Sequence, residues 1–198
     1  RYDEAVADFT DVLRLRPKSS GALRARAGIY ADLKRYDQAA EDYDRAIDLE
    51  PDLPISYIAR GNFRSQLGRD AEAIADFDRA IELYPSAAEA YSGRAYVLLQ
   101  QGNLKGALKS FDQALKFNEK ASYVLGGRAS AYQILGDHDA AIRDYRAAVA
   151  NDPGEPFIQL LYFVEQARAG KTDEAKKNFA TFAADTRFDD WPRALAQF

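Results

Sequence analysis

Residues 54–87 read PISYIARGNFRSQLGRDAEAIADFDRAIELYPSA, and this stretch is the unit that the rest of the chain repeats. Its small, apolar and aromatic residues recur at i and i+4, and then at i, i+4 and i+7, which is helical spacing. They are Tyr57 and Gly61, then Ala73, Phe77 and Ala80. A break at Leu67-Gly68 separates the two sets, and Pro85 closes the unit. We therefore expect two short amphipathic helices joined by a tight turn.

The prolines show the length of the repeat. Pro17, Pro51 and Pro85 are 34 residues apart, and Pro153 follows Pro85 by 68 residues. In the same register an alanine recurs, followed four residues later by an aromatic residue: Ala5, Ala39, Ala73, Ala107, Ala141 and Ala175, with Phe9, Tyr43, Phe77, Phe111, Tyr145 and Phe179. A small residue lets a neighbouring helix approach while the ring fills the space beside it. Six helices are therefore expected to share one packing face.

A period of 34 with this spacing resembles the tetratricopeptide repeat. The family's large residue at repeat position four is matched by Leu23, Tyr57, Tyr91 and Leu125, and its small residue at position eight by Ala27, Gly61, Ala95 and Ala129. Position twenty-seven is alanine, as in the family, at Ala46, Ala80, Ala114 and Ala148. The match covers nearly the whole chain. It implies an all-α fold, a right-handed superhelical solenoid of antiparallel helix pairs.

The register divides the chain, residues 1–198, into a single array of repeats. The expected segments are a half repeat with a second helix only at 1–19, complete repeats at 20–53, 54–87, 88–121 and 122–155, a divergent repeat at 156–187, and a C-terminal capping helix at 188–198. Trp191, Leu195 and Phe198 would cover the last repeat. Because the chain begins without Met in the middle of a repeat, we expect a fragment of a longer chain.

The composition limits the function. The chain is 47% hydrophobic and 29% charged, so it can bury a continuous core and stay soluble. The net charge is -4 and there is no basic tail, so the chain lacks the basic surface that a general nucleic-acid binder needs. The absence of cysteine excludes disulfides and thiolate sites, and no apolar run approaches the ~20 residues that a membrane span needs. Cytoplasm and periplasm fit equally well.

The family usually has leucine at repeat position seven, where this chain has Arg26, Arg60, Arg94 and Arg128. On a helical wheel this position lies about 60° from the core stripe, so it flanks the core. Structural ion pairs with second-helix aspartates are therefore favoured over a basic ladder that grips an acidic partner. We expect pairing with the preceding repeat, as Arg26 with Asp8, Arg60 with Asp42 and Arg94 with Asp76. Pairing within the repeat is the alternative.

No motif predicts catalysis. His138, the only histidine, lies in a turn between two expected helices and has no second His, no Cys and no ordered carboxylate with which to form a metal or acid-base site. Phosphate-binding loops, nucleophile elbows and zinc-helix motifs are absent from the sequence. We expect no enzymatic activity, no cofactor and no metal. The basic residues between Arg14 and Arg35 are expected to form a solvated surface that could steer an acidic partner.

In the tetratricopeptide repeat family the first helices line the concave face, and on the wheel repeat positions two, five, six, nine, twelve and thirteen oppose the core stripe. At these positions we predict a peptide-binding or partner-binding groove formed by Ile55, Ile58, Asn62, Ser92, Tyr96, Leu99, Tyr123, Gly126, Gly127 and Ser130. Two adjacent glycines in a helix suggest a close approach to the backbone. Either a ligand or another first helix of the same protein could make that approach.

The sequence thus predicts a non-enzymatic scaffold or adaptor whose concave groove binds a peptide or a partner helix. A chaperone carboxylate clamp is not expected, because only Asn62 matches the Lys and Asn pattern of that subclass. The alternative is a self-assembling module in which another copy covers the exposed face of the N-terminal half repeat, around Val6, Phe9 and Leu13. The expected partner is therefore another protein or peptide, or a second copy, and not nucleic acid.

Overall fold

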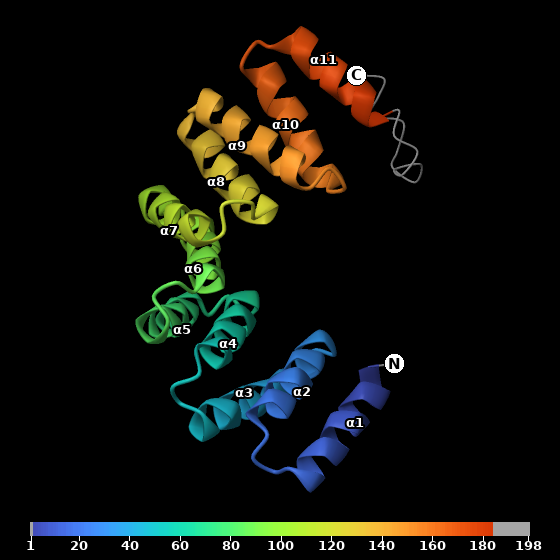
Figure 1. Cartoon of the computed structure of the whole chain (residues 1–198), viewed down its shortest axis with the longest axis vertical. Coiled ribbons are helices and arrows are strands. Elements are labelled where there is room, and N and C mark those ends of the chain that lie inside the picture. Colours follow the sequence, from blue (N-terminus) through green and yellow to red (C-terminus); the bar gives the residue numbers. More distant parts are fainter. Residues whose placement is uncertain (1, 184–198) are drawn as a thin grey trace. The chain divides into compact units, whose positions relative to one another are not determined.

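The structure, a computed structural model, describes residues 2–183 and contains eleven α-helices and no strand in that range (Figure 1). The helices are α1 (Tyr2–Leu15), α2 (Ser20–Asp32), α3 (Tyr36–Leu49), α4 (Pro54–Gln66), α5 (Asp70–Leu83), α6 (Ala88–Gln100), α7 (Leu104–Phe117), α8 (Ser122–Leu135), α9 (His138–Asn151), α10 (Pro156–Arg168) and α11 (Thr172–Ala183). None of these helices is long and apolar enough to cross a membrane. The expected capping helix with Trp191, Leu195 and Phe198 lies outside the described residues.

The helices pack on their neighbours in chain order, as the repeat predicted. α2 packs on α3, α4 on α5, α8 on α9 and α10 on α11, and each of α1, α3, α5, α7 and α9 also packs on the helix that follows it. The first helices of successive repeats begin at Ser20, Pro54, Ala88, Ser122 and Pro156. The helical repeat fold of antiparallel helix pairs is therefore confirmed. The chain divides into two compact units, the first ending at Gln101 and the second beginning at Gly102, and each is described by itself.

Local signals mark several of the helix ends. Pro54 and Pro156 occupy the first turn of α4 and α10, where the missing N–H costs nothing. Gly68, Gly102, Gly136 and Gly170 end first helices with φ between 70° and 78°, a left-handed conformation that favours glycine. In the α2–α3 turn the same conformation falls to Lys34, with φ 59°. Glycine therefore occupies the left-handed position in four of these turns, and lysine occupies it in the fifth.

The core is built from rings enclosed by small residues. In the first unit the ring of Phe77 on α5 is fully buried. A Cβ added to Gly61 on α4 would lie 2.9 Å from this ring, and one added to Gly93 on α6 would lie 2.5 Å from it. The aligned alanines of the second helices Ala39, Ala73, Ala107, Ala141 and Ala175 are likewise fully buried. Larger side chains at these positions would separate the helices.

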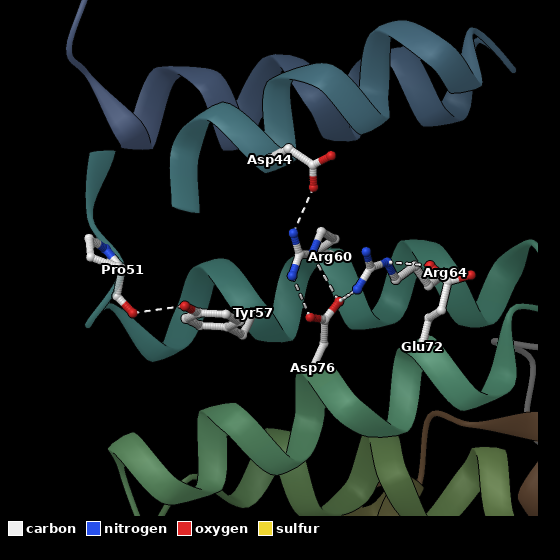
Figure 2. Close-up of polar contacts among 7 residues, drawn as sticks. All are labelled: Asp44, Pro51, Tyr57, Arg60, Arg64, Glu72 and Asp76. Carbon is white, nitrogen blue, oxygen red and sulfur yellow. Dashed lines mark hydrogen bonds and ion pairs between the residues drawn. The ribbon is translucent and has the colours of Figure 1, made fainter. Parts of the chain in front are cut away.

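The arginine at repeat position seven joins three helices (Figure 2). Arg60 of α4 makes a bidentate pair with Asp76 of α5, with Nε–Oδ2 and Nη2–Oδ1 distances of 3.0 and 2.7 Å. Its Nη1 donates to Asp44 of α3 at 2.6 Å. Asp76 also accepts from Nη1 of Arg64, at 2.6 Å. A single guanidinium therefore connects its own repeat with the preceding one.

The same arrangement recurs at two other arginines. Arg128 makes the bidentate pair with Asp144 at 2.7 and 2.8 Å, and its Nη1 donates to Asp112 of α7 at 2.7 Å. Arg26 pairs with Asp42 at 2.7 and 2.8 Å, and its Nη1 donates to the hydroxyl of Thr10 at 3.0 Å. The hydrogen bond to Asp42 raises the pKa of Arg26, against the opposing effect of burial. These guanidiniums are committed to structural pairs.

The favoured version of the arginine pairing was wrong. The bidentate pairs lie within the repeat, so Arg26 pairs with Asp42 and not with Asp8, and Arg60 pairs with Asp76 and not with Asp42. The contact with the preceding repeat exists as well, but it uses a carboxylate two residues further along, as in the pair of Arg94 with Asp78. The reason is that a guanidinium has two edges and can bind both neighbours at once.

We predict that Arg26→Ala lowers the free energy of unfolding by about 2 to 3 kcal/mol, because it strands the buried carboxylate of Asp42. Arg60→Ala should cost less, since Arg64 still donates to Asp76. Urea unfolding followed by circular dichroism measures both. Arg79→Ala, which removes a pair between exposed side chains, is the control and should leave stability unchanged. An Arg26→Ala variant as stable as the control would contradict the prediction.

Candidate functional site

In the first unit a groove of about 400 Å³ lies between the first helices α2 and α4. α2 contributes Arg24, Gly28, Ile29 and Asp32, α4 contributes Asn62, Phe63 and Gln66, and Tyr43 of α3 adjoins the groove from the second-helix layer. Arg24 lies toward the start of α2, and Asp32 is its last residue. The groove therefore combines apolar walls with donors, acceptors and one charge of each sign.

The hydroxyl of Tyr43, a residue that lines the groove, has no hydrogen-bond partner in the part of the chain that the structure describes. The equivalent tyrosine of the second unit, Tyr145, hydrogen bonds with Ser130 Oγ at 3.0 Å and with Gln133 Oε1 at 3.4 Å. Gly28 and Ala31 occupy the corresponding positions around Tyr43, each 102 residues earlier in the sequence. A Cβ on Gly28 would lie 3.7 Å from the Tyr43 hydroxyl. Within residues 2–183 no hydrogen bond to this hydroxyl is formed, so a ligand could provide one.

The Tyr43 hydroxyl is a neutral donor and acceptor at physiological pH. Burial of the ring raises the pKa of Tyr43, and the negative charge of Asp32 raises it further. The ring itself packs on Phe63, with 5.3 Å between the ring centroids. A rigid ring thus holds the hydroxyl in place at the groove.

The groove carries opposite charges toward its two ends. Arg24 is half-buried and donates from Nη1 to Ser56 Oγ at 3.2 Å and to Ser20 Oγ at 3.5 Å. Asp32 is exposed, and among the described residues no cationic side chain lies within 4.0 Å of its carboxylate. The two residues are eight positions apart in the helix, which corresponds to about 12 Å along the helix axis.

The residues predicted for the first unit occupy different environments. Asn62 is exposed and lines the groove, and Ile55 is exposed near the start of α4. Ile58 is buried in the cluster that contains Phe77. Ser92 is buried, and its hydroxyl donates to the carbonyl oxygen of Glu89 at 3.0 Å. Tyr96 and Leu99 are half-buried. Asn62 is therefore the predicted residue that the groove contains.

In the second unit the predicted residues serve mainly to pack the helices. Tyr123 is exposed, but Gly126 and Gly127 are buried. A Cβ on Gly126 would lie 3.4 Å from Cδ1 of Ile158, so α10 makes the close approach at this glycine. Ser130 donates to the carbonyl oxygen of Gly126 at 3.0 Å in addition to its bond with Tyr145. The sequence left two explanations for the glycine pair, a ligand or another first helix. At Gly126 the close approach is made by another first helix, α10.

Sequence reasoning missed the α2 side of the groove, although the signal was present. When applied to residues 20–53, the positions used for the three following repeats select, in addition to Gly21, five residues: Arg24, Ala25, Gly28, Ala31 and Asp32. All five line the groove. The lack of a hydrogen-bond partner for the Tyr43 hydroxyl could also have been predicted by aligning the repeats, because Gly28 and Ala31 cannot replace the side chains of Ser130 and Gln133.

His138 has an ordered carboxylate partner, contrary to the sequence prediction. Its Nδ1 lies 2.5 Å from Oε1 of Glu165, a fully buried residue of α10. The other oxygen, Oε2, makes no hydrogen bond with the described residues and lies 3.8 Å from Nη1 of Arg168. Aligned repeats have Phe63, Val97 and Ala131 at this position. The arrangement joins α9 to α10 and provides no nucleophile or second ligand for chemistry.

We predict opposite effects for the two partners. His138→Ala should lower the free energy of unfolding by about 1 to 3 kcal/mol, because it leaves the buried carboxylate of Glu165 uncompensated. Glu165→Leu should leave the melting temperature unchanged or raise it, since an apolar residue suits a site that is apolar in the other repeats. In the Glu165→Leu background the cost of His138→Ala should disappear. An equal cost in both backgrounds would show that the two side chains are not coupled.

Comparisons with known proteins identify the fold. The family model of the tetratricopeptide repeat matches residues 1–54, 58–122 and 106–156. A sequence search of curated proteins finds no significant match. Among solved structures, PilW, described as a widely conserved type IV pilus biogenesis factor, is 24% identical with a TM-score of 0.83, and the match covers 94% of this chain and 87% of that chain.

Two further structures are similar. PilF of Pseudomonas aeruginosa is 19% identical with a TM-score of 0.80, covering 98% of this chain and 86% of that chain. YrrB, described as a TPR protein with an unusual peptide-binding site, is 19% identical with a TM-score of 0.66, covering 90% and 93%. At these identities the similarity shows the fold.

Proposed function

The chain belongs to the tetratricopeptide repeat family, and we propose that it is a non-enzymatic adaptor that binds an extended segment of a partner protein in the α2–α4 groove. Proteins of this family serve in general as scaffolds for protein–protein interactions. The observation that carries the proposal is the Tyr43 hydroxyl, which adjoins an open groove where its counterpart Tyr145 is satisfied internally.

The groups around the groove suit a peptide backbone. Each residue of an extended peptide offers one N–H and one C=O group. Asn62 and Gln66 carry both donors and acceptors on α4, and Tyr43 provides a third polar group between apolar surfaces such as Phe63. A volume of about 400 Å³ lies within the usual range of ligand sites. The description of a peptide-binding site in YrrB agrees with this use of the fold.

We predict that Gly28→Phe abolishes peptide binding, because the new side chain would enter the groove above Tyr43. The measurement is enrichment of a displayed library of random dodecapeptides on the immobilised chain. Ala75→Phe, at an exposed position of α5 outside the groove, is the matched control and should enrich the same peptides as the unmodified chain. Melting curves establish that both variants fold. Equal enrichment on the Gly28→Phe variant would place binding elsewhere.

Self-association through α1 is a second candidate, favoured by one observation. Leu13 is buried against α2, but Val12 and Leu15 on the same helix are exposed, with 72% of Leu15 accessible. Exposed apolar area gains free energy when another chain covers it. A second copy of this chain could supply that cover.

If α1 pairs with another copy, the sedimentation coefficient should rise with protein concentration. Leu15→Glu should then keep the chain monomeric, because a carboxylate would have to be buried in the contact. Leu135→Glu, at an exposed leucine of α8, is the control and should not change association. A sedimentation coefficient that is independent of concentration would exclude self-association through α1.

A further inference from the structure

We propose that the α2–α4 groove selects an extended peptide that carries an acidic and a basic side chain about four residues apart. This inference rests on the proposed function and adds the chemistry of the partner. It is drawn from the two charged groups of the groove, Arg24 and Asp32, and from the direction of the helices that hold them.

The Arg24 end of the groove suits a carboxylate. A guanidinium has five N–H donors, and the hydrogen bonds of Arg24 to Ser20 and Ser56 use Nη1 alone. Ser56 is fully buried near the start of α4, so this contact fixes the position of the guanidinium. Arg16 and Lys18, which precede α2, add positive charge at the same end. An incoming carboxylate would therefore meet a positioned cation with free donors.

The Asp32 end suits a cation. Asp32 is the last residue of α2, and Gln66, the last residue of α4, lines the same end of the groove. Both helices therefore end here. The negative ends of their dipoles add to the negative potential that the Asp32 carboxylate creates at this end of the groove. No ion pair is formed by Asp32 with any of the described residues. A lysine or arginine of the partner would supply the missing positive charge.

The distance between the two charges sets the spacing in the peptide. Arg24 and Asp32 are eight helical positions apart, or about 12 Å along α2. An extended chain covers about 3.3 Å per residue, so side chains about four residues apart reach both groups. Residues i and i+4 of an extended strand also point to the same side, toward the groove. The residues between them would lie over Tyr43 and Phe63.

The test uses the same library of random dodecapeptides. Peptides enriched on the unmodified chain, relative to the Gly28→Phe variant, should carry an acidic and a basic residue three to five positions apart in one preferred order. The double variant Arg24→Glu/Asp32→Lys exchanges the two charges without changing the net charge. It should enrich peptides in which the order is reversed, and it should bind the original peptides about tenfold less tightly.

A double variant outside the groove is the control. Arg69→Glu/Asp48→Lys makes the same exchange at exposed residues, and it should enrich peptides with the original order. Enriched peptides without the charge pattern, or an unchanged order on the Arg24→Glu/Asp32→Lys variant, would overturn the inference and leave peptide binding in the groove intact. No enrichment over the Gly28→Phe variant would overturn the proposed function as well.

Discussion

The close approach of helices over small residues is the constraint on which the rest of the structure depends. Phe77 is enclosed because neither Gly61 nor Gly93 has a side chain that would push its helix away. Small and aromatic residues recur at these positions with the period of 34 residues, so each pair presents a similar face to the next. In the first unit this brings α2 and α4 side by side, with the groove between them. The packing of the helices therefore creates the groove to which the proposed function is assigned.

The period predicted the fold well because each repeat carries its own local signals, such as Pro54 at a helix start and Gly68 in a turn. It predicted side-chain partners less well. A helical wheel gives the direction of Arg60 but not its reach along the axis, so Asp44 and Asp76 could not be distinguished from Asp42. The burial of Glu165 was not predicted from the sequence. No local pattern indicates that this carboxylate lies at a repeat position that is apolar and buried in the three preceding repeats.

The residues expected to line the groove differ in their surroundings, for a related reason. The wheel identifies the side of a first helix that faces away from its own partner, but the next first helix covers some of that side. Ile58 is buried in this way, and Gly126 lies against Ile158, whereas Asn62 stays in the open groove. The difference between Tyr43 and Tyr145 is informative because both have the same place in the repeat and, within residues 2–183, only Tyr145 has hydrogen-bond partners for its hydroxyl.

The arginine contacts also bear on how such a chain can evolve. The two carboxylates bound by Arg60 lie 16 residues before it and 16 residues after it, a span shorter than one repeat. Arg128 has the same spacing. A duplication or deletion of one whole repeat by unequal recombination would therefore restore an equivalent pair at the new junction. Between repeats that keep both aspartates, the length of the array can change in a single genetic event without leaving the buried charge unpaired.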